Sequence, residues 1–135
     1  MVTTTALRGI APFFIVRNLQ NSIAFYQSLG FEIEYTGGGD GKDPSTDFFG
    51  MVYRDNVMIM LKAITPEVQP QPNSSRHPWA AWDAYVVTPD PDALFAEFVG
   101  RAVPIYKPLA DTSDGLRAFE IKDADGYVLC FGRPR

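Results

Sequence analysis

The sequence has few of the residues that form metal, disulfide and nucleophilic sites. Among 135 residues it contains one cysteine, Cys130, and one histidine, His77. A single cysteine excludes a disulfide within the chain, and no Cys/His spacing typical of zinc sites is present. A Ser/His/Asp set would have to use His77, and position indicates no Cys/His pair.

Basic residues are also too few and too dispersed for a nucleic-acid-binding surface. Lys and Arg number 12 against 16 Asp and Glu, which gives a net charge of −4 without a basic run. This balance is compatible with a neutral or cationic small ligand. No stretch is apolar enough for a signal peptide or a membrane span. We therefore expect a cytoplasmic protein without a nucleic-acid or membrane partner.

What is present is an ordinary globular composition, 46% hydrophobic and 21% charged, arranged in a pattern that occurs twice. In the first copy, Asn18 is a predicted N-cap and Gly30 a predicted helix end. A strand over residues 10–16 precedes this helix. A strand over 31–36 and a hairpin of 48–53 and 57–62, turning at Asp55-Asn56, follow it.

The second copy repeats this order after a Pro-rich segment. Asp90 caps the predicted helix, and the predicted strands are 82–87, 103–106 and a hairpin over 116–131 around Asp123–Gly126. The expected organisation is thus a first βαβββ module over residues 1–64, a linker over 65–80 and a second module over 81–135. Matching Asn18 to Asp90 also matches Ala11 to Asp83, and matching the hairpin ends pairs Met60 with Cys130.

Three stretches carry a resemblance to a known family, and together they cover nearly the whole chain: residues 14–31, 88–98 and 119–132. The most specific feature is the Asp-x-Asp-Gly-Tyr turn before the last strand. The sequence resembles the vicinal-oxygen-chelate superfamily of glyoxalase I, extradiol dioxygenases and bleomycin-resistance proteins. The resemblance implies an α+β fold of two tandem βαβββ modules, whose sheets curve into a half-open barrel cavity with the helices outside. It also implies a homodimer.

In the metal-using members of this superfamily, four ligands come from the first and last strands of each module. The corresponding positions are Ala11, Met60, Asp83 and Cys130. Alanine has no ligand atom and a thioether is a poor ligand for a hard divalent ion, so we expect no metal and no cofactor.

Alternation along the strands extends the cavity face from these four positions. A two-residue turn at Asp55-Asn56 pairs Met60 with Met51, and a four-residue turn would set Phe119 opposite Cys130. The lining is then aromatic and thioether-rich, with one carboxylate that could select a donor or cationic group. The predicted ligand-binding residues are Phe13, Met51, Met58, Met60, Asp83, Tyr85, Phe119 and Cys130.

Plain structural roles compete with this interpretation at each position. Met and Phe at strand spacing also form ordinary core, Cys130 is most simply a small buried hydrophobe, and Arg76 could satisfy Asp83 as an ion pair. Trp79 and Trp82 could cover the pocket mouth or a dimer interface. Turn and surface roles are expected for three further acids: Glu120, Asp123 and Asp125.

Three hypotheses of function follow. The first is a metal-free protein that binds or sequesters an aromatic or amphipathic small molecule, similar to the bleomycin-resistance branch. The second is a lyase, isomerase or dioxygenase of the same superfamily, with or without a metal. The third is a non-catalytic interaction module whose own side chains fill the cavity. The residues favour the first and assign no catalytic group.

Overall fold

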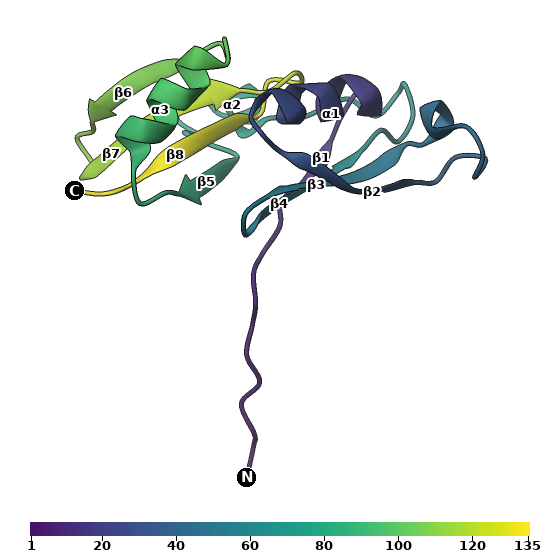
Figure 1. Cartoon of the computed structure of the whole chain (residues 1–135), viewed down its shortest axis with the longest axis horizontal. Helices are drawn as coiled ribbons and strands as arrows, with labels where there is room; N and C mark the ends of the chain where they lie inside the picture. The colour runs from purple at the N-terminus through teal and green to yellow at the C-terminus, as the bar shows by residue number, and fades with distance from the viewer.

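The computed structural model describes residues 1–135 and contains two successive βαβββ units (Figure 1). The first unit comprises β1 (Phe13–Ile15), α1 (Leu19–Ser28), β2 (Glu32–Gly37), β3 (Phe49–Arg54) and β4 (Val57–Lys62), with a short 3-10 turn η1 (Pro44–Thr46) before β3. The connecting segment contains the one-turn helix α2 (Asn73–Arg76). The second unit comprises β5 (Ala84–Val87), α3 (Pro91–Gly100), β6 (Lys107–Asp111), β7 (Leu116–Lys122) and β8 (Val128–Pro134).

The two sheets have the same topology, with strand orders β1-β4-β3-β2 and β5-β8-β7-β6. In each sheet the first strand pairs in parallel with the last, and the remaining pairs are antiparallel. Helices α1 and α3 cover the same side of the two sheets, and the opposite side is left uncovered (Figure 1). The expected α+β fold of two βαβββ modules is confirmed, and neither sheet closes into a barrel.

Both long helices begin and end in the same way, as a duplicated unit requires. The side chain of Asn18 accepts a hydrogen bond from Asn21 N at 2.9 Å, and that of Asp90 accepts one from Ala93 N at 3.0 Å. These bonds satisfy an otherwise orphan donor in each first turn. Beyond the helix ends the chain adopts positive φ angles at two equivalent positions, Gly30 and Ala102. Neither of these helices, nor α2, has the length and hydropathy of a membrane span.

One hydrophobic core of 17 buried residues runs beneath both helices. Tyr26 and Val52 belong to it from the first unit, and Phe98, Phe119 and Phe131 from the second. In the second unit Phe98 stands edge-on to both Phe119 and Phe131, at ring-centroid distances of 5.6 and 5.3 Å. The two units therefore share one hydrophobic core and do not form two separate cores joined by the connecting segment.

The turn between β7 and β8 joins the second unit to the first. Asp125 accepts hydrogen bonds from Arg17 N and Ser22 Oγ, each at 3.0 Å, at the start of α1. Asp123 accepts one from the Tyr26 hydroxyl at 2.7 Å. Both aspartates are buried, so the expected surface role was wrong for them. The turn role was right, because Asp123 also accepts the N–H groups of Asp125 and Tyr127.

One strand of the second unit begins later than predicted. Residues 103–106 precede β6, whose ladder with β7 starts at Lys107. Pro104 has no N–H to donate to a ladder, and Val103 instead packs in the core after donating to the carbonyl of Phe98. Strand β6 therefore begins after this proline, at Lys107.

Candidate ligand-binding site

The uncovered face of the first sheet carries a row of aromatic and thioether side chains. Phe13 pairs with Met60, Met60 with Met51, and Met51 with Tyr35, so one residue of each strand lies in the row. The pairing of Met51 with Met60 confirms the expectation from the two-residue turn. Phe13 and Tyr35 are 51% and 49% exposed, whereas the neighbouring Phe14 points into the core.

The equivalent row on the second sheet is polar. Tyr85 pairs with Cys130, Cys130 with Glu120, and Glu120 with Lys107. Tyr85 follows Phe13 by the same 72 positions that relate Asp90 to Asn18, so the two rows occupy corresponding places in the two modules. A thioether pair in the first module is replaced by a thiol and a carboxylate in the second.

The placement of Phe119 opposite Cys130 was wrong. The connection between β7 and β8 spans five residues, 123–127, because the ladder ends at the pair Lys122–Val128. This length pairs Phe119 with Phe131 and turns it toward α3, where its ring lies 5.3 Å from that of Phe95. Glu120 takes the place on the uncovered face.

Asp83 is held by backbone donors. Its two carboxylate oxygens accept Asn73 N at 2.7 Å and Val128 N at 2.8 Å, which tie the connecting segment to the start of β8. Arg76 does not form the ion pair considered from the sequence and instead donates to Asn73 Oδ1 at 2.7 Å. The carboxylate is thus engaged in the fold.

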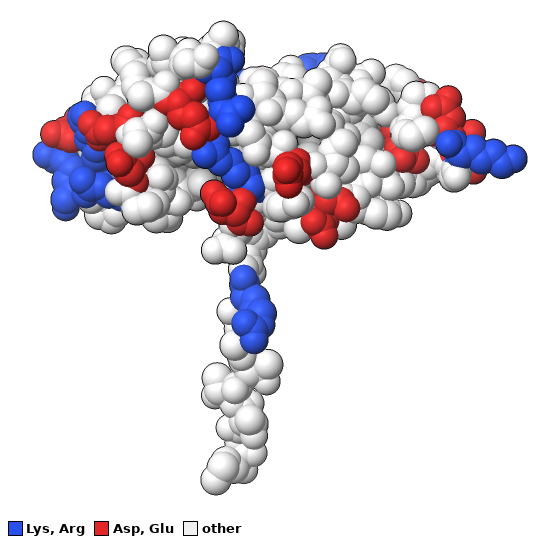
Figure 2. Space-filling model, viewed as in Figure 1, with Lys and Arg blue, Asp and Glu red and all other residues white.

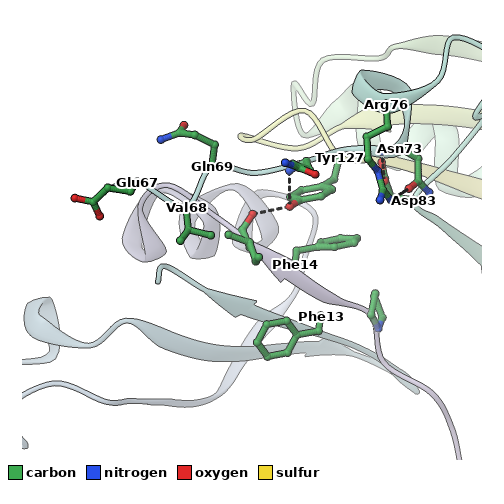
Figure 3. A pocket seen from close by; sticks show the side chains of 12 residues that line it. Phe13, Phe14, Glu67, Val68, Gln69, Asn73, Arg76, Asp83 and Tyr127 are labelled. Carbon is green, nitrogen blue, oxygen red and sulfur yellow. Dashed lines mark hydrogen bonds between the residues drawn. The ribbon is translucent and has the colours of Figure 1, made fainter. Parts of the chain in front are cut away.

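Two clefts border Asp83. The larger, about 750 Å³, lies between β1 and the connecting segment, with Phe13, Val68 and Tyr127 among its lining residues (Figure 3). Tyr127 forms part of its wall, donating from its hydroxyl to Ile15 O at 2.6 Å and accepting from Gln71 N at 3.3 Å. Its ring stacks on Phe14 at 4.2 Å.

The second cleft, about 520 Å³, lies between the two units and is lined mainly by hydrophobic residues. It brings together four residues that the sequence placed around the cavity: Ala11, Met58, Asp83 and Tyr85. Phe13 lines the larger cleft. Met51, Met60 and Cys130 belong to the two rows, and Cys130 is buried.

Trp82 and Glu120 were not among the predicted ligand-binding residues. The Trp82 ring stacks on Tyr85 at a centroid distance of 5.3 Å, and its Nε1 donates to Glu120 Oε2 at 3.3 Å. Glu120 Oε1 and the Tyr85 hydroxyl are screened from solvent and have no hydrogen-bond partner. Glu120 and Phe119 are neighbours on β7 and point to opposite faces of the sheet. Because Phe119 was predicted to face the cavity, Glu120 was assigned to the opposite face.

The donor atoms of this region do not fit a divalent metal. No group of three or more His, Cys, Asp and Glu side chains is placed to hold one. Burial, reinforced by the charge of Glu120, raises the pKa of Cys130 to about 12, so the thiol stays protonated. Of the family ligand positions, Ala11 and Met60 contribute no oxygen or nitrogen donor, and Asp83 is already bonded.

Comparisons with known proteins agree with this architecture. A bleomycin-binding protein from Streptomyces verticillus, solved with copper(II)-bleomycin, has a TM-score of 0.69 at 20% identity, covering 98% of this chain and 100% of that one. A glyoxalase-related enzyme from Clostridium phytofermentans has a TM-score of 0.72 at 14% identity, covering 97% and 98%. A bleomycin-binding protein complexed with bleomycin has a TM-score of 0.67 at 18% identity, covering 94% and 98%.

The comparison with curated protein sequences found no match. The family model described as Glyoxalase/Bleomycin resistance protein/Dioxygenase superfamily matches residues 9–131, nearly the whole chain. Glyoxalases, bleomycin-resistance proteins and dioxygenases share this model, so the match indicates a common fold and ancestry and does not choose among their functions. The chain belongs to the Glyoxalase/Bleomycin resistance protein/Dioxygenase superfamily.

Proposed function

We propose that this protein binds an aromatic or amphipathic small molecule, without a metal, on the uncovered faces of its two sheets. The observation that carries the proposal is the pair of corresponding rows, one of aromatic and thioether side chains and one of polar side chains. Two proteins that share the fold are described as bleomycin-binding and were solved with bleomycin, which supports a small-molecule ligand here.

The first row suits a flat ring system. Aromatic rings such as Phe13 and Tyr35 offer stacking surfaces, and the flexible, polarizable side chains of Met51 and Met60 adapt to the outline of a ligand. The chemistry of the second row supports binding in preference to catalysis. Its thiol is protonated, which makes Cys130 a poor nucleophile.

We further propose that a second copy of the chain closes the site. Residues 1–10 form no helix or strand and extend away from the body on the uncovered side of the sheets (Figure 1). Leu7 and Ile10 in this arm are 96% and 95% exposed, and Arg8 is its one charged side chain (Figure 2). Apolar side chains on such an arm are stabilised by packing on a partner. A homodimer would cover both the arm and the rows.

Acridine, a flat neutral ring system at mildly alkaline pH, tests the proposed binding. In a Trp79→Phe background, Trp82 alone reports on the site, so acridine should quench its fluorescence and raise the melting temperature. Changing Met51 and Met60 together to Gln should weaken acridine about tenfold through lost apolar contact, on the order of 1.4 kcal/mol. Val99→Gln, on the exposed side of α3, is the matched control and should leave affinity unchanged.

Elemental analysis of protein purified without chelator tests the metal-free part separately. We expect substoichiometric Zn, Fe, Ni and Mn. One tightly held equivalent of any of them would overturn that part. Absence of binding by acridine and by 9-aminoacridine, its amino derivative, would overturn the proposed ligand class.

A further inference from the structure

The second row contains a carboxylate with one oxygen that is both shielded from solvent and unpartnered. Glu120 Oε2 accepts the indole N–H of Trp82, whereas Oε1 is shielded from solvent and has no partner. The Tyr85 hydroxyl, on the same face across Cys130, is shielded and unpartnered too. Trp82 contacts both residues, stacking on Tyr85 and donating to Glu120.

We propose that Glu120 is the specificity-determining residue of the site and selects ligands that carry a cationic N–H group on an aromatic body. The inference rests on the proposed function and deepens it. Tyr85 provides a second polar contact, and the Trp82 ring provides a stacking surface between them.

No cation of the protein neutralises this carboxylate. Glu120 forms no ion pair, and its row neighbour Lys107 directs its ammonium to the ring of Tyr106, 5.8 Å from the centroid. Lys122, two residues along β7, lies over the same ring at 4.1 Å. Neither ammonium group forms an ion pair with Glu120, so the side chains of the protein supply no charged donor to its unpaired oxygen.

Desolvation makes that oxygen selective. A carboxylate oxygen removed from water without a partner is costly, and a charged donor restores the lost interaction most fully. A ligand without a charged donor does not offset this desolvation cost, and an anionic ligand would be repelled by the carboxylate. Asp83, which borders both clefts, cannot take this role because both of its oxygens accept backbone N–H groups.

The dimensions agree with a fused-ring ligand. Tyr85 and Glu120 lie two strand spacings apart, about 10 Å, with Cys130 between them. The corresponding row on the first sheet has no ionisable group except the phenol of Tyr35. The two modules therefore divide recognition into an apolar contribution and a charged one.

The test compares 9-aminoacridine, a cation with N–H donors, with neutral acridine in the full-length protein at mildly alkaline pH. Quenching of Trp82 in the Trp79→Phe background gives both affinities. We expect 9-aminoacridine to bind more tightly. Glu120→Gln, which keeps an acceptor for Trp82, should weaken 9-aminoacridine about ten- to a hundredfold and leave acridine unchanged. Tyr85→Phe should weaken 9-aminoacridine by a smaller factor.

The matched control is Glu34→Gln, which removes an exposed carboxylate on β2 of the other sheet. It should leave both affinities unchanged. If acridine binds and Glu120→Gln does not alter the preference for the cation, the inference is overturned and the proposed function stands. If neither probe binds, both fail. If Glu120→Gln raises the dimer dissociation constant without affecting probe binding, Glu120 pairs with a second copy and the inference is overturned.

Discussion

Three aspartates, two of them buried and Asp83 half-buried, show how local hydrogen bonding decides what an acidic residue does. Asp83 and Asp125 accept hydrogen bonds at both oxygens, and Asp123 does so while lying beneath the Tyr26 hydroxyl. Glu120 differs because one of its oxygens is shielded and unpaired. All four positions carry a carboxylate. The hydrogen-bond donors around each one decide whether it has a structural role, as in the three aspartates, or is a candidate ligand contact, as in Glu120.

Asp123 makes a prediction about pH. Burial raises its pKa to about 6 from the ordinary 3.8, so the folded protein holds the proton more tightly than the unfolded chain. The stability this group contributes is present below pH of about 4 and is lost as pH rises through about 6. The loss is on the order of 3 kcal/mol, because each pKa unit corresponds to about 1.4 kcal/mol.

Asp123→Asn resembles the protonated side chain and should remove this loss. Urea unfolding of wild type and variant across this pH range should give free energies that agree at the acid end, with the variant more stable at the neutral end. Asp55→Asn, in the exposed β3–β4 turn, should run parallel to wild type. Parallel curves for Asp123→Asn would contradict the raised pKa.

At the scale of elements, the duplication shows most clearly at the helix ends. Gly30 follows α1 with φ of 87°, and Ala102 occupies the equivalent place after α3 with φ of 61°. Glycine adopts this left-handed conformation freely, whereas an alanine Cβ crowds the following carbonyl. The second module thus keeps a backbone conformation that its residue disfavours.

Ala102→Gly should therefore stabilise the protein by about 0.5–1 kcal/mol, the strain relieved less the extra entropy of an unfolded glycine. Equilibrium denaturation at neutral pH measures the change. Ala96→Gly, in the exposed middle of the same helix, should instead destabilise by about 1 kcal/mol. Destabilisation by both substitutions would mean that the positive φ at residue 102 carries no strain.

Considered as a whole, the molecule is closed on its helical side and open on the other. On the closed side the modules share one core, and Arg54 of the first makes two hydrogen bonds of 2.8 Å to Glu97 of the second. On the open side no long helix covers the sheets, and the arm extends from this side (Figure 1). This asymmetry is the reason for proposing a second copy.

The arm provides the test of that proposal. Deleting residues 2–9 should shift a dimer toward monomer and weaken acridine, because the arm and the rows would lose a common partner. Light scattering and sedimentation across a concentration series measure the change. Arg8→Gln keeps the apolar arm residues and should leave the assembly intact. A wild-type protein that is monomeric throughout that series would contradict the proposed dimer.

Much of the fold could be read from local patterns. Asn18 and Asp90 marked the helix starts, and the two-residue turn at Asp55-Asn56 set the pairing of Met51 with Met60 correctly. The β7–β8 turn was misjudged by one residue. Because strand side chains alternate in direction, that single step exchanged Phe119 and Glu120 between the core and the uncovered face.

Periodicity, capping residues and turn chemistry are properties of neighbours along the chain, and they sufficed to predict two βαβββ modules. The resemblance to the superfamily then indicated which positions hold the usual metal ligands, and none of them is a histidine in this sequence. The engagement of Asp83 by Asn73 N and Val128 N, and the free oxygen of Glu120 beside Trp82, depend on groups up to 45 residues apart. Such contacts exist only after the sheet and the connecting segment have folded together. Phe13, Met51 and Met60 of the apolar row were predicted from the sequence and Tyr35 was not, whereas the choice of Glu120 over Asp83 as the selecting carboxylate came from tertiary hydrogen bonding.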